Sequence, residues 1–194
     1  MIRTCIAFAV AAFCMLAGSG HSEPANIVFT GQDPDGLILV GLRSKTAFRG
    51  ARRNWLEFAK YNPSTTGLAN PGSTGPTVDI TDVGMEWKYF LLKVPPAHYV
   101  IRSLHRRKLV HCLDKGTLAF EVEPGKITYI GDIELRRSGI GFAGMEVERA
   151  HKAVLENPDI KAVLKPALDI KRTRFSAGGD AAGAKSACSG ISFR

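Results

Sequence analysis

The sequence predicts a mainly β fold, a small antiparallel β-sandwich with one or two C-terminal helices. Short apolar runs bounded by Gly, Pro and polar residues recur from Leu37 to Leu135, and the apolar period becomes helical only after residue 145. At 194 residues, with 45% hydrophobic and 23% charged residues, the chain has the length and composition of one globular domain. We therefore expect a single β-rich domain over residues 37–175.

The first strands follow from turn signals and alternation. The turn cluster Gln32–Gly36 leads into the apolar run Leu37–Arg43, which is typical of a buried strand. Residues 55–61 alternate so that Leu56 and Phe58 share one face, and a surface loop rich in Gly, Pro, Ser and Thr follows over residues 65–77.

Two further strands, Lys88–Lys93 and His98–Leu104, flank the segment Val94–Ala97. The two prolines in that segment cannot donate ladder hydrogen bonds, so we expect a connection there.

The most regular alternation predicts a β-hairpin around the turn Pro124-Gly125. Apolar residues alternate with polar ones before this turn and again after it. The side chains expected to be buried are Leu118, Phe120, Val122, Ile127, Tyr129 and Ile133.

A helical stripe ends the domain. Val147, Ala150, Val154 and Leu155 fall on one face, and Asn157-Pro158 should stop the helix. A short second helix is expected to carry Ile160, Val163 and Leu164, so the helical segment lies near residues 146–164. Residues 166–175 are a candidate last strand, and residues 176–194 are predicted to be a flexible tail.

Residues 1–20 have the features of a cleavable secretory signal peptide. Arg3 precedes an apolar run over residues 5–17, and Gly18, Ser19 and Gly20 follow. We predict cleavage between Ala17 and Ser22, with residues 21–36 as a linker and first turn. The protein is then periplasmic or secreted, with no membrane span after cleavage; an uncleaved N-terminal anchor is the alternative.

Cleavage leaves Cys112 and Cys188 as the remaining thiols. In an oxidising compartment we expect them to form a disulfide; two unpaired thiols are the alternative.

The formal charge of +8 favours anionic partners. We expect an anionic envelope polymer or a protein partner and no nucleic acid, because export separates the chain from it; solubility alone is the alternative explanation of the charge. The best candidate binding residues for an anionic ligand are Arg102, His105, Arg106, Arg107 and Lys108. A solvated hairpin tip would carry the same residues, and Arg136-Arg137 and the cations near Lys171 could extend the patch.

The segment from Ser103 to Asp114 also contains His105, His111 and Cys112. A zinc site usually has paired ligand spacing, which is missing, and adjacent strand residues point to opposite faces, which separates His111 from Cys112. We therefore predict no catalytic residues, no metal and no cofactor. Aromatic residues offer a carbohydrate-stacking alternative, although strand aromatics are more often core; they are Trp55, Trp87 and Tyr89.

Two segments, Val94–Ser103 (VPPAHYVIRS) and Phe120–Leu135 (FEVEPGKITYIGDIEL), resemble bacterial envelope proteins and lipoproteins of unknown function. Their β-sandwich is similar to transthyretin-like, or carboxypeptidase-regulatory-like, domains, and the resemblance covers roughly residues 37–164. Ala97-His98 stands where that family usually has Pro-Gly, and Cys14 is not placed for lipidation. The resemblance implies the fold and no catalytic residues.

The combined expectation is a non-enzymatic exported module that binds an envelope component or a protein partner. The alternative is a hydrolase or metal-dependent enzyme that uses the segment His105–Asp114.

Overall fold

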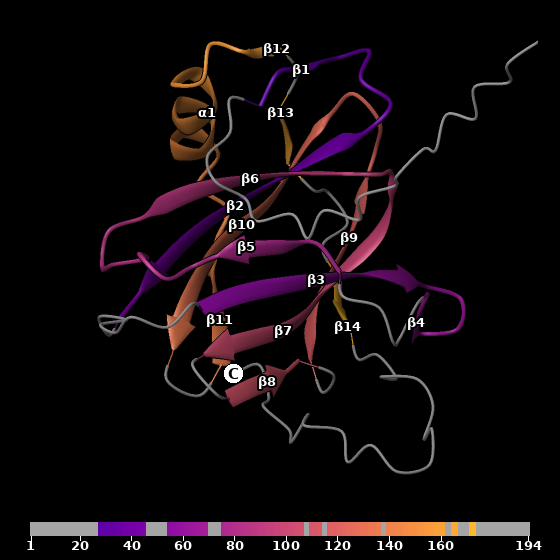
Figure 1. Cartoon of the computed structure of the whole chain (residues 1–194), viewed down its shortest axis with the longest axis vertical. Coiled ribbons are helices and arrows are strands. Elements are labelled where there is room, and N and C mark those ends of the chain that lie inside the picture. The colour runs from indigo at the N-terminus through magenta and orange to yellow at the C-terminus, as the bar shows by residue number, and fades with distance from the viewer. Residues whose placement is uncertain are drawn as a thin grey trace, which may run out of the picture.

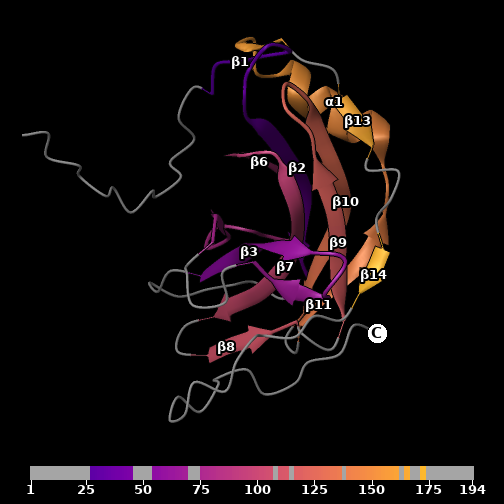
Figure 2. The same cartoon turned by 90° about the vertical axis from the view of Figure 1, so that its right-hand side faces the viewer.

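The computed structural model describes residues 27–45, 54–69, 75–106, 109–113, 116–136, 139–161, 164–166 and 171–173. These residues form two main sheets that pack face to face, with a helix on the outer side of one sheet (Figures 1 and 2). The predicted signal peptide and the predicted tail lie outside the described residues.

The first sheet, called sheet 1 here, has the strand order β11-β10-β2-β6, and β13 also pairs with β10. Its strands are β2 (Gly36–Ser44), β6 (Lys88–Val94), β10 (Ile127–Arg136), β11 (Gly139–Gly144) and β13 (Leu164–Pro166). The β2–β6 and β10–β11 pairs are antiparallel, whereas β2 and β10 run parallel. Sheet 1 is therefore mixed, and the expectation of a wholly antiparallel sandwich is wrong in this respect, because β10 pairs in parallel with both β2 and β13.

The second sheet, called sheet 2 here, has the order β14-β9-β7-β3-β4, and β5 and β8 add to β3 and β7. Its strands are β3 (Asn54–Asn62), β4 (Gly67–Leu68), β5 (Thr77–Asp79), β7 (Ala97–Arg106), β8 (Leu109–Cys112), β9 (Thr117–Val122) and β14 (Lys171–Thr173). A small parallel pair, β1 (Phe29–Thr30) with β12 (Ile160–Lys161), lies beside the helix α1 (Val147–Leu155) at one end of the molecule (Figure 1).

The main core lies between the two sheets. Alternate residues of β2, β3, β7, β9 and β10 fill it; among them are Ile38, Val40, Leu42, Leu56, Phe58, Ile101, Leu104, Phe120, Ile133 and Leu135. A second cluster lies on the outer face of sheet 1, where Ala150 and Val154 of α1 cover Leu39 and Tyr129. Figure 2 shows α1 on the side of β10 that faces away from sheet 2.

The mainly β, sandwich-like fold is confirmed, and so is the burial of all six residues expected around the Pro124-Gly125 turn. The predicted hairpin is wrong, because β9 pairs with β7 and β14 in sheet 2 while β10 belongs to sheet 1. The turn instead hydrogen-bonds to the residue just before β2: Gly125 N–H donates to Asp35 O at 2.8 Å. Alternation shows that both strands have a buried face, but it cannot show that they belong to one sheet.

The helical prediction is right for α1 and wrong beyond it. Ala150 and Val154 are buried, but Leu155 is 69% exposed. Ile160–Lys161 and Leu164–Pro166 are short strands rather than a second helix, because their backbones pair with β1 and β10. Local apolar spacing could not reveal those distant strand partners.

Candidate functional site

A β-bulge in β10 creates the polar part of the outer face of sheet 1. Tyr129 pairs with Leu39 and Asp132 pairs with Gly41, so β10 contains one more residue than β2 between these two pairs. Gly131 sits in the bulge with φ +98°, a conformation that residues with a Cβ rarely adopt. The bulge brings Tyr129 and Asp132 to the same face although they are three residues apart.

Asp132 is a buried carboxylate with two strong donors. It is 1% exposed; the Tyr129 hydroxyl donates to Oδ1 at 2.6 Å, and Arg149 Nη2 of α1 donates to Oδ2 at 3.0 Å. Burial, together with the bond to Asp132, raises the pKa of Tyr129 far above its usual value, so this phenol remains a donor. Gly41 leaves the necessary room, since a Cβ there would lie 2.1 Å from Asp132 Oδ1.

Glu134, two residues further along β10, gathers three cations. Burial opposes its ionisation, but hydrogen bonds from Arg43, Arg136 and Lys45 outweigh this effect and lower its pKa to about 2. Lys45 Nζ and Arg136 Nη2 lie 3.3 and 3.1 Å from Oε2, while Arg43 pairs with Oε1. One buried carboxylate thus fixes three cationic side chains at the surface.

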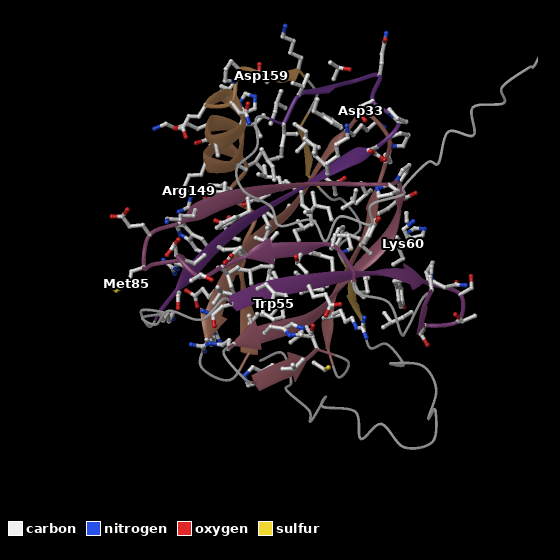
Figure 3. All side chains as sticks on the ribbon, viewed as in Figure 1. Asp33, Trp55, Lys60, Met85, Arg149 and Asp159 are labelled. Carbon is white, nitrogen blue, oxygen red and sulfur yellow. The ribbon has the colours of Figure 1, made fainter. Side chains whose placement is uncertain are left out.

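Trp87, just before β6, contacts both the arginine that pairs with Glu134 and the arginine that pairs with Asp132. The Arg43 guanidinium carbon lies 4.4 Å from the centre of the Trp87 ring, and that of Arg149 lies 5.4 Å from it. Both distances are within the range of cation–π attraction. Figure 3 shows Arg149 between α1 and β6.

Arg106 extends this group from sheet 2, because its Nη1 donates to the backbone oxygen of Arg136 at 2.9 Å. We call the resulting set the cationic surface; it consists of Arg43, Lys45, Arg106, Arg136, Arg149 and Trp87. Arg43 and Arg149 keep 36% and 45% of their side chains exposed. Guanidinium groups that are fixed and still partly exposed can bind oxyanions with little further loss of side-chain entropy.

The outer face of sheet 2 carries a separate polar group centred on Glu57. A register shift between Glu57 and Phe58 gives β7 an extra residue, so Arg102 and Ser103 both reach this carboxylate. Ser103 Oγ donates to Glu57 Oε2 at 2.6 Å, and Arg102 Nη1 lies 3.3 Å from Oε1. Burial opposes ionisation of Glu57, but hydrogen bonds from His105, Ser103 and the Gly75 backbone lower its pKa to about 2.

His105 completes this group without forming a proton relay. Its Nε2 lies 2.9 Å from Ser103 Oγ and 3.2 Å from Glu57 Oε2, so serine and carboxylate meet the same ring nitrogen. A Ser-His-acid triad instead uses the two nitrogens of the imidazole separately. The ring also stacks on Trp55, with centroids 4.3 Å apart.

The candidate binding residues from the sequence therefore separate. Arg102 and His105 are bound to Glu57 on sheet 2, Arg106 belongs to the cationic surface, and Arg107 and Lys108 lie outside the described residues. Of the suggested extensions, Arg136 does join Arg106.

The aromatic platform is not assembled. Trp55 lies on β3 in sheet 2 (Figure 3). Tyr89 lies on β6 in sheet 1, and Trp87 immediately precedes β6. The Tyr89 hydroxyl is buried, with no hydrogen-bond partner among the described residues, and burial raises its pKa to about 12.

His111 and Cys112 occupy successive positions of β8, opposite Leu104 and Ser103. They therefore point to opposite faces, as expected. Cys112 is buried, and Cys188 lies outside the described residues, so their pairing stays a prediction. Within the described residues no group of three or more His, Cys, Asp or Glu side chains is placed to hold a metal ion.

No motif or spacing in the sequence joins Arg43, Trp87, Asp132, Glu134 and Arg149. These residues come from β2, the approach to β6, β10 and α1, and only the alternation of residues 132, 134 and 136 hinted at a polar face. No helix in the described part of the chain is long and apolar enough to cross a membrane.

Comparisons with family models, with curated proteins and with solved structures found no match to this chain. The resemblance to envelope proteins with transthyretin-like domains accordingly remains a prediction.

Proposed function

We propose that the chain is an exported, non-enzymatic β-sandwich module, periplasmic or secreted, that binds an anionic envelope component or protein partner through the cationic surface. The observation that carries the proposal is the convergence of Arg43 and Arg149 over Trp87, each guanidinium tied to a carboxylate at most 6% exposed. Two preorganised guanidiniums beside an aromatic ring suit a ligand that carries carboxylate or phosphate groups.

The charge balance supports an anionic ligand. Asp132 and Glu134 are buried beneath the cations, whereas the cationic side chains remain partly exposed. Glu146 Oε2, 3.9 Å from Arg149 Nη2, is an acidic group at this edge, and the exposed Glu86 precedes Trp87 in the chain. An anionic ligand therefore contacts the exposed cations rather than the buried carboxylates. Its affinity should fall as the salt concentration rises, because salt screens the attraction.

The alternative, a hydrolase that uses His105–Asp114, gains no support from the described geometry. Ser103 is 1% exposed and already donates its proton to Glu57, a carboxylate whose low pKa makes it a weak base. The arrangement supplies hydrogen-bond donors to the buried carboxylate of Glu57 and does not activate a nucleophile.

The test is binding of the exported full chain to polygalacturonate, a polymer of carboxylated sugars, at low and at physiological salt. Arg43→Gln and Arg149→Gln should each weaken binding at least about tenfold, because a charge-assisted hydrogen bond contributes about 1.5–3 kcal/mol. Lys60→Gln is the matched control: it removes one exposed cation from β3, in sheet 2 (Figure 3).

Equal affinity of the two arginine variants and Lys60→Gln, at unchanged melting temperature, would contradict the proposal. Salt-independent binding would contradict it as well.

A further inference from the structure

Strand β6 is an edge of sheet 1 with apolar side chains along its length. Among the described strands only β2 pairs with β6, and Figure 2 shows β6 at the side of sheet 1 away from β10. The edge of β6 opposite β2 is called the open edge here. Four successive residues, Tyr89 to Leu92, are half-buried, while Lys88 and Lys93 are exposed. A long apolar edge of this kind can accept a further strand.

The hydrogen-bond pattern shows which backbone groups face the open edge. Leu37 N–H donates to Lys126 O just before β10, so residues 37, 39 and 41 direct their backbone groups toward β10. The intervening residues of β2 bond to β6 through the pairs Ile38 with Leu92, Val40 with Phe90 and Leu42 with Lys88. The N–H and C=O groups of Tyr89, Leu91 and Lys93 therefore point away from β2.

The side chains beside this edge define the occupant. Phe90 and Leu92 pack against the core between the sheets, so an added strand would extend that core with apolar side chains on its inner face. Its outer-facing side chains would lie beside Tyr89, Leu91 and Lys93, on the face that carries Arg43, Arg149 and Trp87. Acidic residues at alternate positions complement this face.

We propose that β6 is a docking edge for an extended acidic polypeptide segment, which adds to sheet 1 as a strand and directs its acidic side chains toward the cationic surface. This inference rests on the proposed function and names the partner class. A polysaccharide offers carboxylates, but only a polypeptide supplies N–H and C=O groups at the strand repeat that Tyr89, Leu91 and Lys93 require. A second copy of this chain, pairing through its own β6, would bring two cationic surfaces together.

The probe is an alternating glutamate–valine peptide about as long as β6. It should bind the full chain at least about tenfold more tightly than polyglutamate of equal length or an alternating lysine–valine peptide. Equal binding of all three peptides would overturn the inference, because neither the apolar face nor the acidic face would then contribute.

N-methylation of the peptide tests the ladder directly. Neighbouring residues of a strand direct their N–H groups to opposite edges, so methylating one set, all glutamates or all valines, should abolish binding while the other set leaves it nearly unchanged. Sensitivity of the glutamate set indicates antiparallel addition, and sensitivity of the valine set indicates parallel addition. An equal effect of both sets refutes strand addition.

A protein variant supplies an independent readout. Lys93 N–H points to the open edge, so Lys93→Pro removes an edge donor while sparing the β2–β6 bonds. It should bind the glutamate–valine peptide about five- to tenfold more weakly than Lys93→Ala, with equal binding to polygalacturonate. Equal peptide binding by the two Lys93 variants contradicts strand addition, whereas insensitivity of polygalacturonate binding to Arg43→Gln contradicts the proposed function instead.

Discussion

Truncation of Phe120 measures how much the core between the sheets contributes to stability. Phe120 is 2% exposed, and its ring contacts Phe58 edge-on and Tyr99 in a stacked arrangement, with centroids 6.2 and 6.3 Å away. Phe120→Ala removes this packing and leaves a cavity, which costs about 3–5 kcal/mol of unfolding free energy. For a domain of this size the melting temperature should fall by roughly 6–20 °C.

Lys126→Ala is the matched control from the other side of the same turn. Lys126 pairs with Glu123 at a partly exposed position, and such pairs contribute about 0–1 kcal/mol. Denaturant unfolding of both variants and the parent chain, followed by circular dichroism in the same oxidation state, gives the two changes in unfolding free energy. Coincident midpoints for Phe120→Ala and Lys126→Ala would refute the assignment of Phe120 to the core.

Three further results are expected. N-terminal sequencing of the exported protein should find a start within the Ala17–Ser22 window; an uncleaved chain contradicts the signal-peptide prediction. Alkylation without reduction should leave Cys112 and Cys188 unmodified by intact mass, and two modified thiols would exclude their disulfide. The pKa of Glu57 and of Glu134 falls from 4.5 in the unfolded chain to about 2, so both contribute stability above about pH 4.5 that is lost as the pH falls toward 2. Glu57→Gln should reduce the loss of stability between those pH values, and an unchanged acid-unfolding curve would contradict this.

The strands were predictable because each is defined by local alternation and turn residues. The run Leu37–Arg43 became β2 with Gly36 and Ser44 added, and the faces expected for Leu56 and Phe58 are those that the core occupies. The partners of those strands were not predictable, as the turn at Pro124-Gly125 shows. It looked like a hairpin, yet it carries the chain from sheet 2 to sheet 1.

The candidate site depended even more on the tertiary structure. The basic run around Arg102 and His105 predicts an anion site, but a shift in register turns both residues toward Glu57, 45 or more residues away in the chain. Arg149 lies within the expected helical segment, and it meets Asp132 only because α1 packs over β10.

By itself the sequence determined that the chain folds as a mainly β domain and which face of each strand around Pro124-Gly125 is buried, because apolar periodicity and turn chemistry are local properties. Only the tertiary structure decided which strands share a sheet, where the bulge at Gly131 turns Asp132, and which cations gather around Trp87. The physical reason is that pairing, register and charge clustering depend on backbone and side-chain partners far apart in the chain. Their free energy is gained only when those segments meet.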